Sequence, residues 1–414
     1  MRSAGTNPDW ANIGILVLTL AGLIFGLLVG FLLLGLALFV GASGDTQGGL
    51  TLETAAVGAI VMALGGLPAA YWSRRALVSH VPPQPRRPSV AWAATAVLFP
   101  VAIGLGYLAS SGLPLPGLFA PMAQVLAAGV PVGLVVLRIR RLAPPITPRR
   151  SWGQFLLGFW LAPVVALPAE LLVLVPVALL WGMGLWLLPD IRPILEALGR
   201  SPSPPPDVLV GSVNELLVHP WTILSALSYM SVLVPLIEEA IKTVGIWPLL
   251  RRRLTAAEAF LGGVLCGAGY ALFEALFLPQ PGSDWALTMV IRVGATLMHA
   301  FTAGVTAWAL AEAVVRHRPR RLVLAYLGSA SIHGLWNAAA LGIGFAGLAV
   351  ESGKAGVSEG AAALPVAIGV AVIAALSGLA LVGIPWIGAR LNRPGSGEDQ
   401  ATIPEAALEP PERA

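Results

Sequence analysis

Long apolar runs occupy most of this 414-residue chain, which is 57% hydrophobic and only 11% charged. An ordinary soluble chain has about a quarter of its residues charged. A helix needs about 20 apolar residues to cross a bilayer. The runs of roughly that length or longer are 12–40, 52–72, 89–110, 118–137, 153–187, 222–250, 255–278, 285–315, 322–348 and 361–389. The sequence therefore predicts an all-α integral membrane protein with about ten transmembrane helices.

Arginines mark every second loop between these runs. They gather in 73–88, 138–150, 251–253, 316–321 and 390–393, whereas the intervening loops are acidic, neutral or balanced. Basic loops stay on the cytoplasmic side of a membrane, so ten spans with both termini cytoplasmic satisfy the pattern. The net charge of +4 thus reflects membrane topology. We expect a lipid bilayer around the protein and no nucleic-acid partner.

Composition and motif content divide the chain into three parts. Residues 1–150 are expected to form an N-terminal four-helix membrane region of unknown role. Residues 151–390 form the membrane core, which carries the polar motifs between 238 and 337. Residues 391–414 are rich in Pro, Gly, Glu and Ala and are predicted to be a disordered cytoplasmic tail.

Prolines distinguish the fifth apolar run and the loop after it. Three prolines within 153–187 predict kinks there. The following segment, 188–221, is the longest outer loop. Its proline-rich stretch 201–206 is expected to be extended, and residues 191–198 before it are expected to form a short helix on the membrane surface.

One charged pentapeptide interrupts the sixth apolar run. Glu238, Glu239 and Lys242 fall within one helical turn, and no other charge occurs from Thr222 to Leu250. A charge at bilayer depth costs from about 3 kcal/mol to well over 10. Lys242 is also one of only two lysines among the 25 basic residues. Charges kept at this cost mark a functional site by default.

Three later runs supply candidate partners. They carry Glu274, then Arg292 and His299, and finally His333 with Asn337. At about 1.5 Å per helical residue, His299 and His333 lie at a depth comparable with Glu238, whereas Glu274 fits that depth least well. Residues three or four apart share a helix face, so Lys242 can neutralise either glutamate, and His333 and Asn337 face the same way. Tyr270 and Glu274, as well as Arg292 and His299 two turns apart, also share faces.

Two hydrolytic schemes suit this set of residues. In the first, one glutamate activates a water while His and Asn donors stabilise the developing oxyanion, and no cofactor is needed. In the second, Glu238, His299 and His333 bind a zinc ion that keeps a water in its open position. Neither an HExxH motif nor a GxSxG motif occurs, and the spans contain no aspartate for an aspartyl dyad.

Non-hydrolytic readings of the same residues stay open. The Glu-Glu-x-x-Lys turn could be a structural salt bridge between helices. The two carboxylates could carry protons in a proton-coupled transporter. A non-catalytic membrane scaffold could also retain the buried Glu/Lys/His set.

Taken together, the motifs resemble the PrsW family of intramembrane proteases, within the larger group of CAAX prenyl proteases and bacteriocin-processing membrane proteases. The family pattern is a Glu-Glu-x-x-Lys segment, a Phe-x-x-x-Glu segment, a histidine in the next span and a final His-x-x-x-Asp/Asn. The resemblance covers about 222–345, in the same order and with one motif per helix. Tyr270 replaces the phenylalanine, and Ala275 stands where an asparagine often follows the glutamate.

The resemblance implies a multi-pass endopeptidase that cuts membrane-tethered proteins, such as an anti-sigma factor or a signal-like segment. It further implies a cell membrane of the bacterial inner-membrane type. In the implied catalytic set, Glu238 is the general base, with Glu239 as the alternative, and Glu274 shares or positions the water. His333 and Asn337 form the oxyanion or ligand face, and His299 supports them. Lys242, Tyr270 and Arg292 are the implied supporting residues.

Overall fold

The computed structural model describes residues 10–44, 46–78, 92–110, 119–142, 146–199, 205–250, 254–278, 284–351 and 359–392. Within these ranges the chain is helical and contains no strand. Nine of the described helices are long and apolar enough to cross a membrane. The predicted fold class, an all-α integral membrane protein, is confirmed.

The third predicted span, 89–110, corresponds to α4 (Trp92–Ser110). It is described as the shorter apolar helix Thr95–Ala109 and is not counted among the nine. Each of the other nine predicted spans overlaps one of those helices. The cytoplasmic position of both termini stays a prediction.

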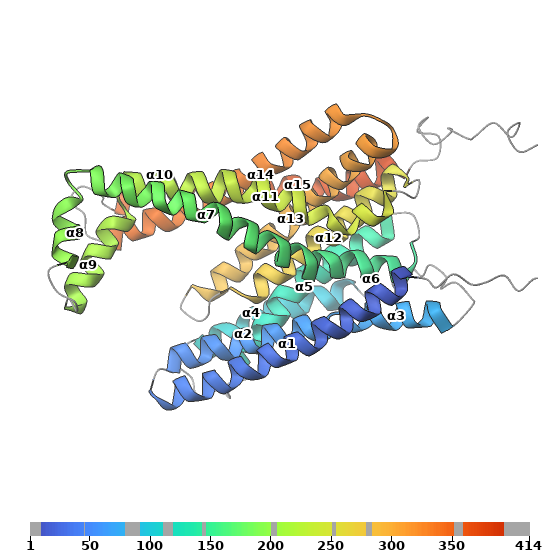
Figure 1. The fold of residues 1–414 in the computed structure, drawn as a ribbon, viewed down its shortest axis with the longest axis horizontal. Helices are drawn as coiled ribbons and strands as arrows, with labels where there is room; N and C mark the ends of the chain where they lie inside the picture. The colour runs from blue at the N-terminus through green and yellow to red at the C-terminus, as the bar shows by residue number, and fades with distance from the viewer. Residues whose placement is uncertain are drawn as a thin grey trace, which may run out of the picture.

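The N-terminal helices form one side of the molecule (blue to teal in Figure 1). The helix α1 packs along α2 and α3, while α4 pairs with α5. Their bounds are α1 Trp10–Ala42, α2 Thr46–Leu64, α3 Leu67–Val78, α4 Trp92–Ser110 and α5 Phe119–Leu142.

The rest of the chain wraps around α12. The elements that follow α5 are α6 Pro148–Leu156, η1 Leu157–Leu161, α7 Ala162–Leu187, α8 Arg192–Gly199, α9 Pro206–Leu217, α10 Pro220–Ser228, η2 Tyr229–Leu233, α11 Val234–Ile241, η3 Lys242–Gly245, η4 Trp247–Leu249, α12 Ala256–Leu276, α13 Trp285–Val315, α14 Pro319–Glu351 and α15 Glu359–Leu391. The most apolar stretch of α12 is 83% buried, compared with 11% in α1. The helix α12 is therefore central, whereas α1 faces the lipid.

Small residues let α12 approach its neighbours closely. A Cβ atom on Gly267 would collide with the backbone oxygen of His299, and one on Gly263 would collide with the backbone oxygen of Ala303. Close backbone approach at glycines is a standard way for membrane helices to associate. The contact at Gly267 also fixes the height of His299 relative to α12.

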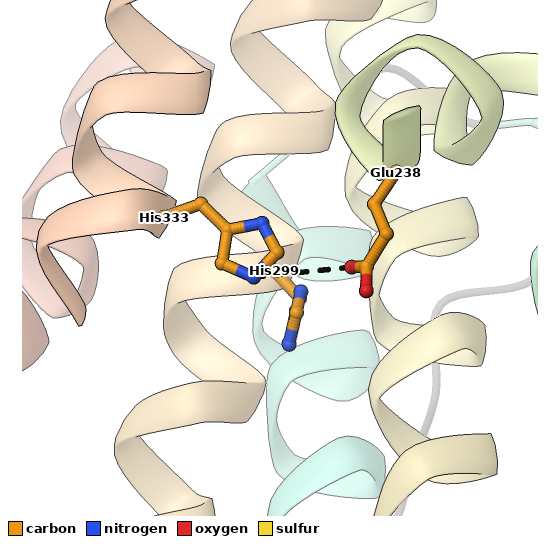
Figure 2. A group of neighbouring side chains, drawn as sticks. All are labelled: Glu238, His299 and His333. Atoms are coloured by element: carbon orange, nitrogen blue, oxygen red, sulfur yellow. Dashed lines mark ion pairs between the residues drawn. The ribbon is translucent and has the colours of Figure 1, made fainter. Parts of the chain in front are cut away.

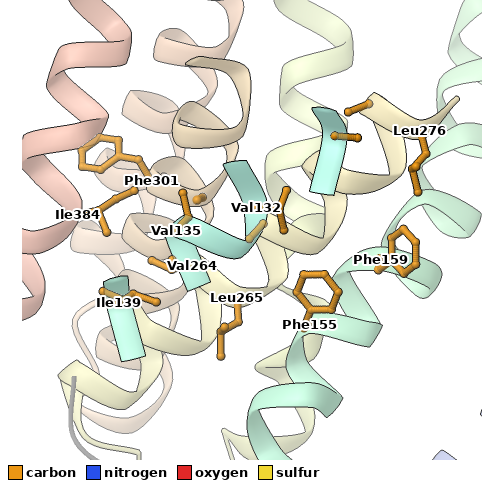
Figure 3. Packing of buried hydrophobic residues seen from close by; sticks show 14 of the residues in the cluster. Val132, Val135, Ile139, Phe155, Phe159, Val264, Leu265, Leu276, Phe301 and Ile384 are labelled. Carbon is orange, nitrogen blue, oxygen red and sulfur yellow. The ribbon is translucent and has the colours of Figure 1, made fainter. Parts of the chain in front are cut away.

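The main apolar core links the N-terminal helices to α12. Figure 3 shows Val132, Val135 and Ile139 of α5 packed among residues of α12, α13 and α15. Gln124 of α5 adds a polar clamp: its Nε2 donates to the Ala275 carbonyl at 2.6 Å, and its Oε1 accepts from Trp285 Nε1 at 2.6 Å. The helix α5 thereby holds the ends of α12 and α13. The domain boundary at residue 150 stays a prediction.

Two π-helical turns interrupt the long helices at equivalent positions. The turn η1 ends two residues before Pro163, and η2 ends two residues before Pro235. Proline has no N–H to donate to the carbonyl four residues earlier, and π-turns often accompany functional sites. In the fifth span, where kinks are predicted, the helix is interrupted at η1, just before Pro163. The helix α7 then continues through Pro168 and Pro176.

The outer loop is more helical than the sequence analysis predicts. The expected surface helix at 191–198 corresponds to α8, but residues 206–217, expected to be loop, form α9. Pro205 is extended (φ −52°, ψ 143°), whereas Pro206 starts α9, where a missing N–H costs nothing. Residues 200–204 lie outside the described ranges. Figure 1 shows α8 and α9 at one end of the molecule, beyond α7 and α10.

Candidate active site

The charged pentapeptide lies where an α-helix tightens into a 3₁₀ turn. The helix α11 ends at Ile241, and η3 begins at Lys242. Glu238 is 5% exposed, and Glu239 and Lys242 are fully buried. The ammonium nitrogen Nζ of Lys242 lies 2.8 Å from Glu238 Oε2 and 3.0 Å from Glu239 Oε1. One lysine thus neutralises both carboxylates, as the spacing of the three residues predicts.

Two buried histidines from other helices meet the same ammonium. Nδ1 of His299, on α13, lies 2.7 Å from Lys242 Nζ, and Nδ1 of His333, on α14, lies 3.4 Å from it. The imidazole rings are 4.9 Å apart, edge to face. His333 Nδ1 also lies 3.0 Å from Glu239 Oε1. The structure therefore brings the motifs of α11, α13 and α14 into one buried cluster.

Hydrogen-bond chemistry assigns the tautomer of each imidazole. An ammonium can only donate, so His299 Nδ1 accepts from Lys242, and the proton of a neutral His299 lies on Nε2. That nitrogen faces Glu274 Oε2 at 2.9 Å. Conversely, His333 Nδ1 faces the acceptor Glu239, so a neutral His333 keeps its lone pair on Nε2, which lies 3.8 Å from Glu238 Oε2.

Glu274 joins the cluster through His299. Its Oε2 accepts from Arg292 at 2.6 Å as well as lying beside His299 Nε2. Arg292 is therefore the counter-ion of a carboxylate. Tyr270, one turn before Glu274, places its ring centre 4.8 Å from Lys242 Nζ and shares a side-chain hydrogen bond with Glu238.

Asn337 lies at the edge of this arrangement. Its Nδ2 donates to the Met230 carbonyl at 2.8 Å, and the residue is half-buried. Met230 lies in the π-turn η2, so Asn337 ties α14 to the segment that leads into the pentapeptide. Its predicted oxyanion role stays a prediction.

Further residues connect α14 to α11 and α13. The Tyr326 hydroxyl donates to the Leu236 carbonyl at 2.6 Å, and Ser329 Oγ donates to the Thr302 carbonyl at 3.2 Å. Tyr326, Ser329 and His333 lie at intervals of three and four, which puts them on one face of α14. The spacing of these three polar residues in the sequence indicates the same stripe.

Glu170 of α7 is another carboxylate near the cluster. It interacts electrostatically with Glu238, Glu274 and Lys242. Its backbone carbonyl accepts from the Tyr229 hydroxyl at 3.0 Å, which joins α7 to η2. From its place in the proline-rich fifth span, Glu170 is expected to be a structural or helix-kink polar group and not part of the site.

Glu238, His299 and His333 could hold a metal ion, because their ligand atoms lie within 4.8 Å of one another (Figure 2). Glutamate and histidine are also ligand types that zinc uses in catalytic sites. However, the Lys242 ammonium contacts Glu238 Oε2 and His299 Nδ1, which are potential ligand atoms of two of these side chains. As arranged in this structure, the three side chains surround a lysine cation, which does not fit a zinc site.

Comparison with known proteins agrees with this site. Residues 174–376 match a family model described as PrsW family intramembrane metalloprotease. No curated protein and no solved structure matches the chain significantly. The matched segment runs from α7 into α15 and contains each of the four polar motifs. Residues 174–376 therefore form a PrsW-family intramembrane protease domain, and the chain is a membrane peptidase.

Proposed function

We propose that this peptidase is an endopeptidase that hydrolyses peptide bonds of membrane-tethered proteins with a glutamate-activated water. The observation that carries the proposal is the convergence of Glu238, Lys242, His299 and His333 from three segments in one buried cluster. General-base chemistry needs a carboxylate held beside groups that fix its orientation and its charge. This cluster meets both conditions.

Glu238 is the proposed general base, and Glu239 is the proposed anchor. The Glu238 side chain is 7% exposed, whereas that of Glu239 is fully buried between Lys242 and His333. A base must meet its water, so the more accessible carboxylate is the better candidate. The 3.8 Å between Glu238 Oε2 and His333 Nε2 is a separation that one water molecule can bridge.

The proposed reaction balances with these groups alone. Glu238 takes a proton from the water while the water oxygen forms a bond to the scissile carbonyl carbon. The Lys242 ammonium, 2.8 Å from Glu238, offsets the negative charge that develops on the tetrahedral intermediate. Glu238 then gives the proton to the leaving nitrogen as the C–N bond breaks. Asn337 is a further proposed donor to the oxyanion.

His299, Glu274 and Arg292 are proposed to position the cation. A continuous chain of contacts begins at Lys242 Nζ, which lies 2.7 Å from the imidazole of His299. That imidazole lies 2.9 Å from the carboxylate of Glu274, which in turn accepts from the guanidinium of Arg292 at 2.6 Å. Each link fixes the donor direction of the next, which keeps the ammonium in place through the reaction.

The proposed substrates are proteins anchored in the same bilayer. The helices α1 and α7 expose large apolar side chains such as Phe31, Leu32, Leu171 and Leu172, which is consistent with a surrounding of lipid. A peptide bond reaches a site enclosed by membrane helices most readily from a membrane-tethered chain. A bacterial-type inner membrane is the proposed location.

Substitution of Glu238 by Gln tests the mechanism. The purified variant, in nanodiscs with a single-span reporter protein, should lose cleavage by a factor of about 10²–10⁴, the usual contribution of a general base. Glu258→Gln is the matched control, since Glu258 is half-buried and paired with Arg150 at 2.6 Å at the start of α12.

Folding is checked in both variants by thermal denaturation. Cleavage by Glu238→Gln at the wild-type rate would refute the assigned base. Equal loss in the Glu258 control would show that the assay reports folding and not chemistry.

A further inference from the structure

The ammonium of Lys242 lies at the centre of the three side chains that could hold a metal ion. Its nitrogen is 2.8 Å from Glu238 Oε2, 2.7 Å from His299 Nδ1 and 3.4 Å from His333 Nδ1. The other ring nitrogen of His299 already faces Glu274. Nδ1 is therefore the His299 atom that could face a metal, and it is the atom that Lys242 contacts.

A zinc ion and this ammonium compete for one position. Zinc binds His nitrogen and Glu oxygen at about 2.0–2.2 Å. An ion at that distance from both Glu238 Oε2 and His299 Nδ1 would lie within about 4 Å of Nζ, because Nζ is less than 3 Å from the same two atoms. Two adjacent cations repel strongly in a buried, weakly screened site.

The surroundings of Lys242 hold it in this position. The side chain is fully buried, and the Tyr270 ring lies 4.8 Å from Nζ. Glu239 supplies a further contact at 3.0 Å. Without the ammonium, two carboxylates would remain in the cluster with no cation from the pentapeptide itself.

We propose that the Lys242 ammonium is the resident cation of this centre and excludes zinc from Glu238, His299 and His333. The catalytic role of this ammonium rests on the function proposed above, whereas its effect on zinc binding does not. The lysine then supplies positive charge that a zinc ion supplies in metal-dependent hydrolases. A neutral side chain at position 242 converts the cluster into a zinc site.

Zinc content of the purified protein tests this proposal. Wild type, Lys242→Met and Lys242→Met/His299→Ala are each equilibrated with Zn²⁺, passed through a desalting column and measured by elemental analysis. We expect less than about 0.1 equivalent in wild type, about one equivalent in Lys242→Met and a loss of that equivalent in the double variant.

Thermal stability provides a readout that is independent of zinc counting. A ligand that binds only the folded state raises the melting temperature, so Zn²⁺ should stabilise Lys242→Met and leave wild type unchanged. Lys242→Gln serves as a second neutral variant if the Met variant does not fold. Zinc affinity of either neutral variant should exceed that of wild type by about tenfold or more.

Specific outcomes overturn the proposal. Wild type that retains half an equivalent of zinc or more, lost on His299→Ala, shows that the lysine does not exclude the metal. Neutral variants that fold and take up no zinc show that the three side chains are not a latent metal site. If neither neutral variant folds, the wild-type zinc content decides the question by the same threshold.

The inference and the proposed function fail in different ways. A wild-type protein that cleaves its reporter through Glu238 and also binds zinc refutes the inference but keeps the peptidase. A protein that excludes zinc and cleaves no membrane-tethered reporter keeps the inference and refutes the proposed reaction.

Discussion

Two buried charge networks occur in the described part of this protein, and they are built differently. In the candidate active site, the Lys242 ammonium meets two carboxylates and two imidazoles. In the second network, Glu312 of α13 is 1% exposed and pairs with the guanidinium groups of Arg316, Arg318 and Arg321. The second network therefore has one acid and three permanent cations.

This contrast separates a network of permanent charges from one whose groups can exchange protons. Arginine stays protonated in proteins, so the Glu312 network cannot pass a proton along its contacts. It joins the end of α13 to the start of α14: the Arg318 N–H donates to the Glu312 carbonyl at 3.1 Å, and Arg321 binds the carboxylate at 2.6 Å. Lysine, histidine and glutamate can each exchange a proton. A buried charge therefore indicates a functional site only where its partners can also exchange a proton.

Removal of His299 should have the largest effect of the three substitutions that sharpen this contrast. In His299→Ala the ammonium loses its 2.7 Å acceptor, and Glu274 loses its link to the cluster. Misplacement of a catalytic group by about 1 Å can cost about 100-fold in rate, and we expect a loss of cleavage of that size. The measurement is kcat in nanodiscs, normalised to the folded fraction. A kcat within twofold of wild type would remove His299 from the proposed mechanism.

Arg292→Gln should have a smaller effect, because Arg292 reaches the ammonium only through Glu274 and His299. We expect kcat to fall about 10-fold with KM little changed, since orientation and not substrate binding is disturbed. Arg292→Lys keeps a cation beside Glu274 and should restore part of the rate. A rise in KM with unchanged kcat would instead indicate that Arg292 contacts the substrate.

Local features of the site were predictable from the sequence for a simple reason. Helical register alone puts Glu238, Glu239 and Lys242 within reach of one another, and the structure confirms both ion pairs. The order of apolar runs likewise predicted nine of the spans that the structure describes. Both properties depend on residues that are close in the chain.

Features that depend on packing between helices were not predictable in the same way. Glu274 appeared too far from the other groups in depth, yet His299 bridges it to Lys242. The position of the ammonium between the candidate metal ligands depends on how α13 and α14 pack against α11. Asn337 shares a helix face with His333, but its amide bonds to Met230 in the π-turn η2. Residue spacing in the sequence does not show where a π-turn shifts the register of a helix.

Glu312→Gln should have the smallest effect on cleavage and a clear effect on stability. Removing one partner of a buried ion pair costs about 3–5 kcal/mol when the other stays buried. The arginine partners here are 19–43% exposed and can turn toward water, so we expect a smaller loss, about 1–3 kcal/mol. Thermal denaturation in nanodiscs should show a lower melting temperature, whereas kcat per folded molecule should stay within about twofold of wild type. A large loss of kcat with an unchanged melting temperature would contradict the distinction between the two networks. It would mean that the start of α14, set by Glu312, controls the position of His333 during the reaction.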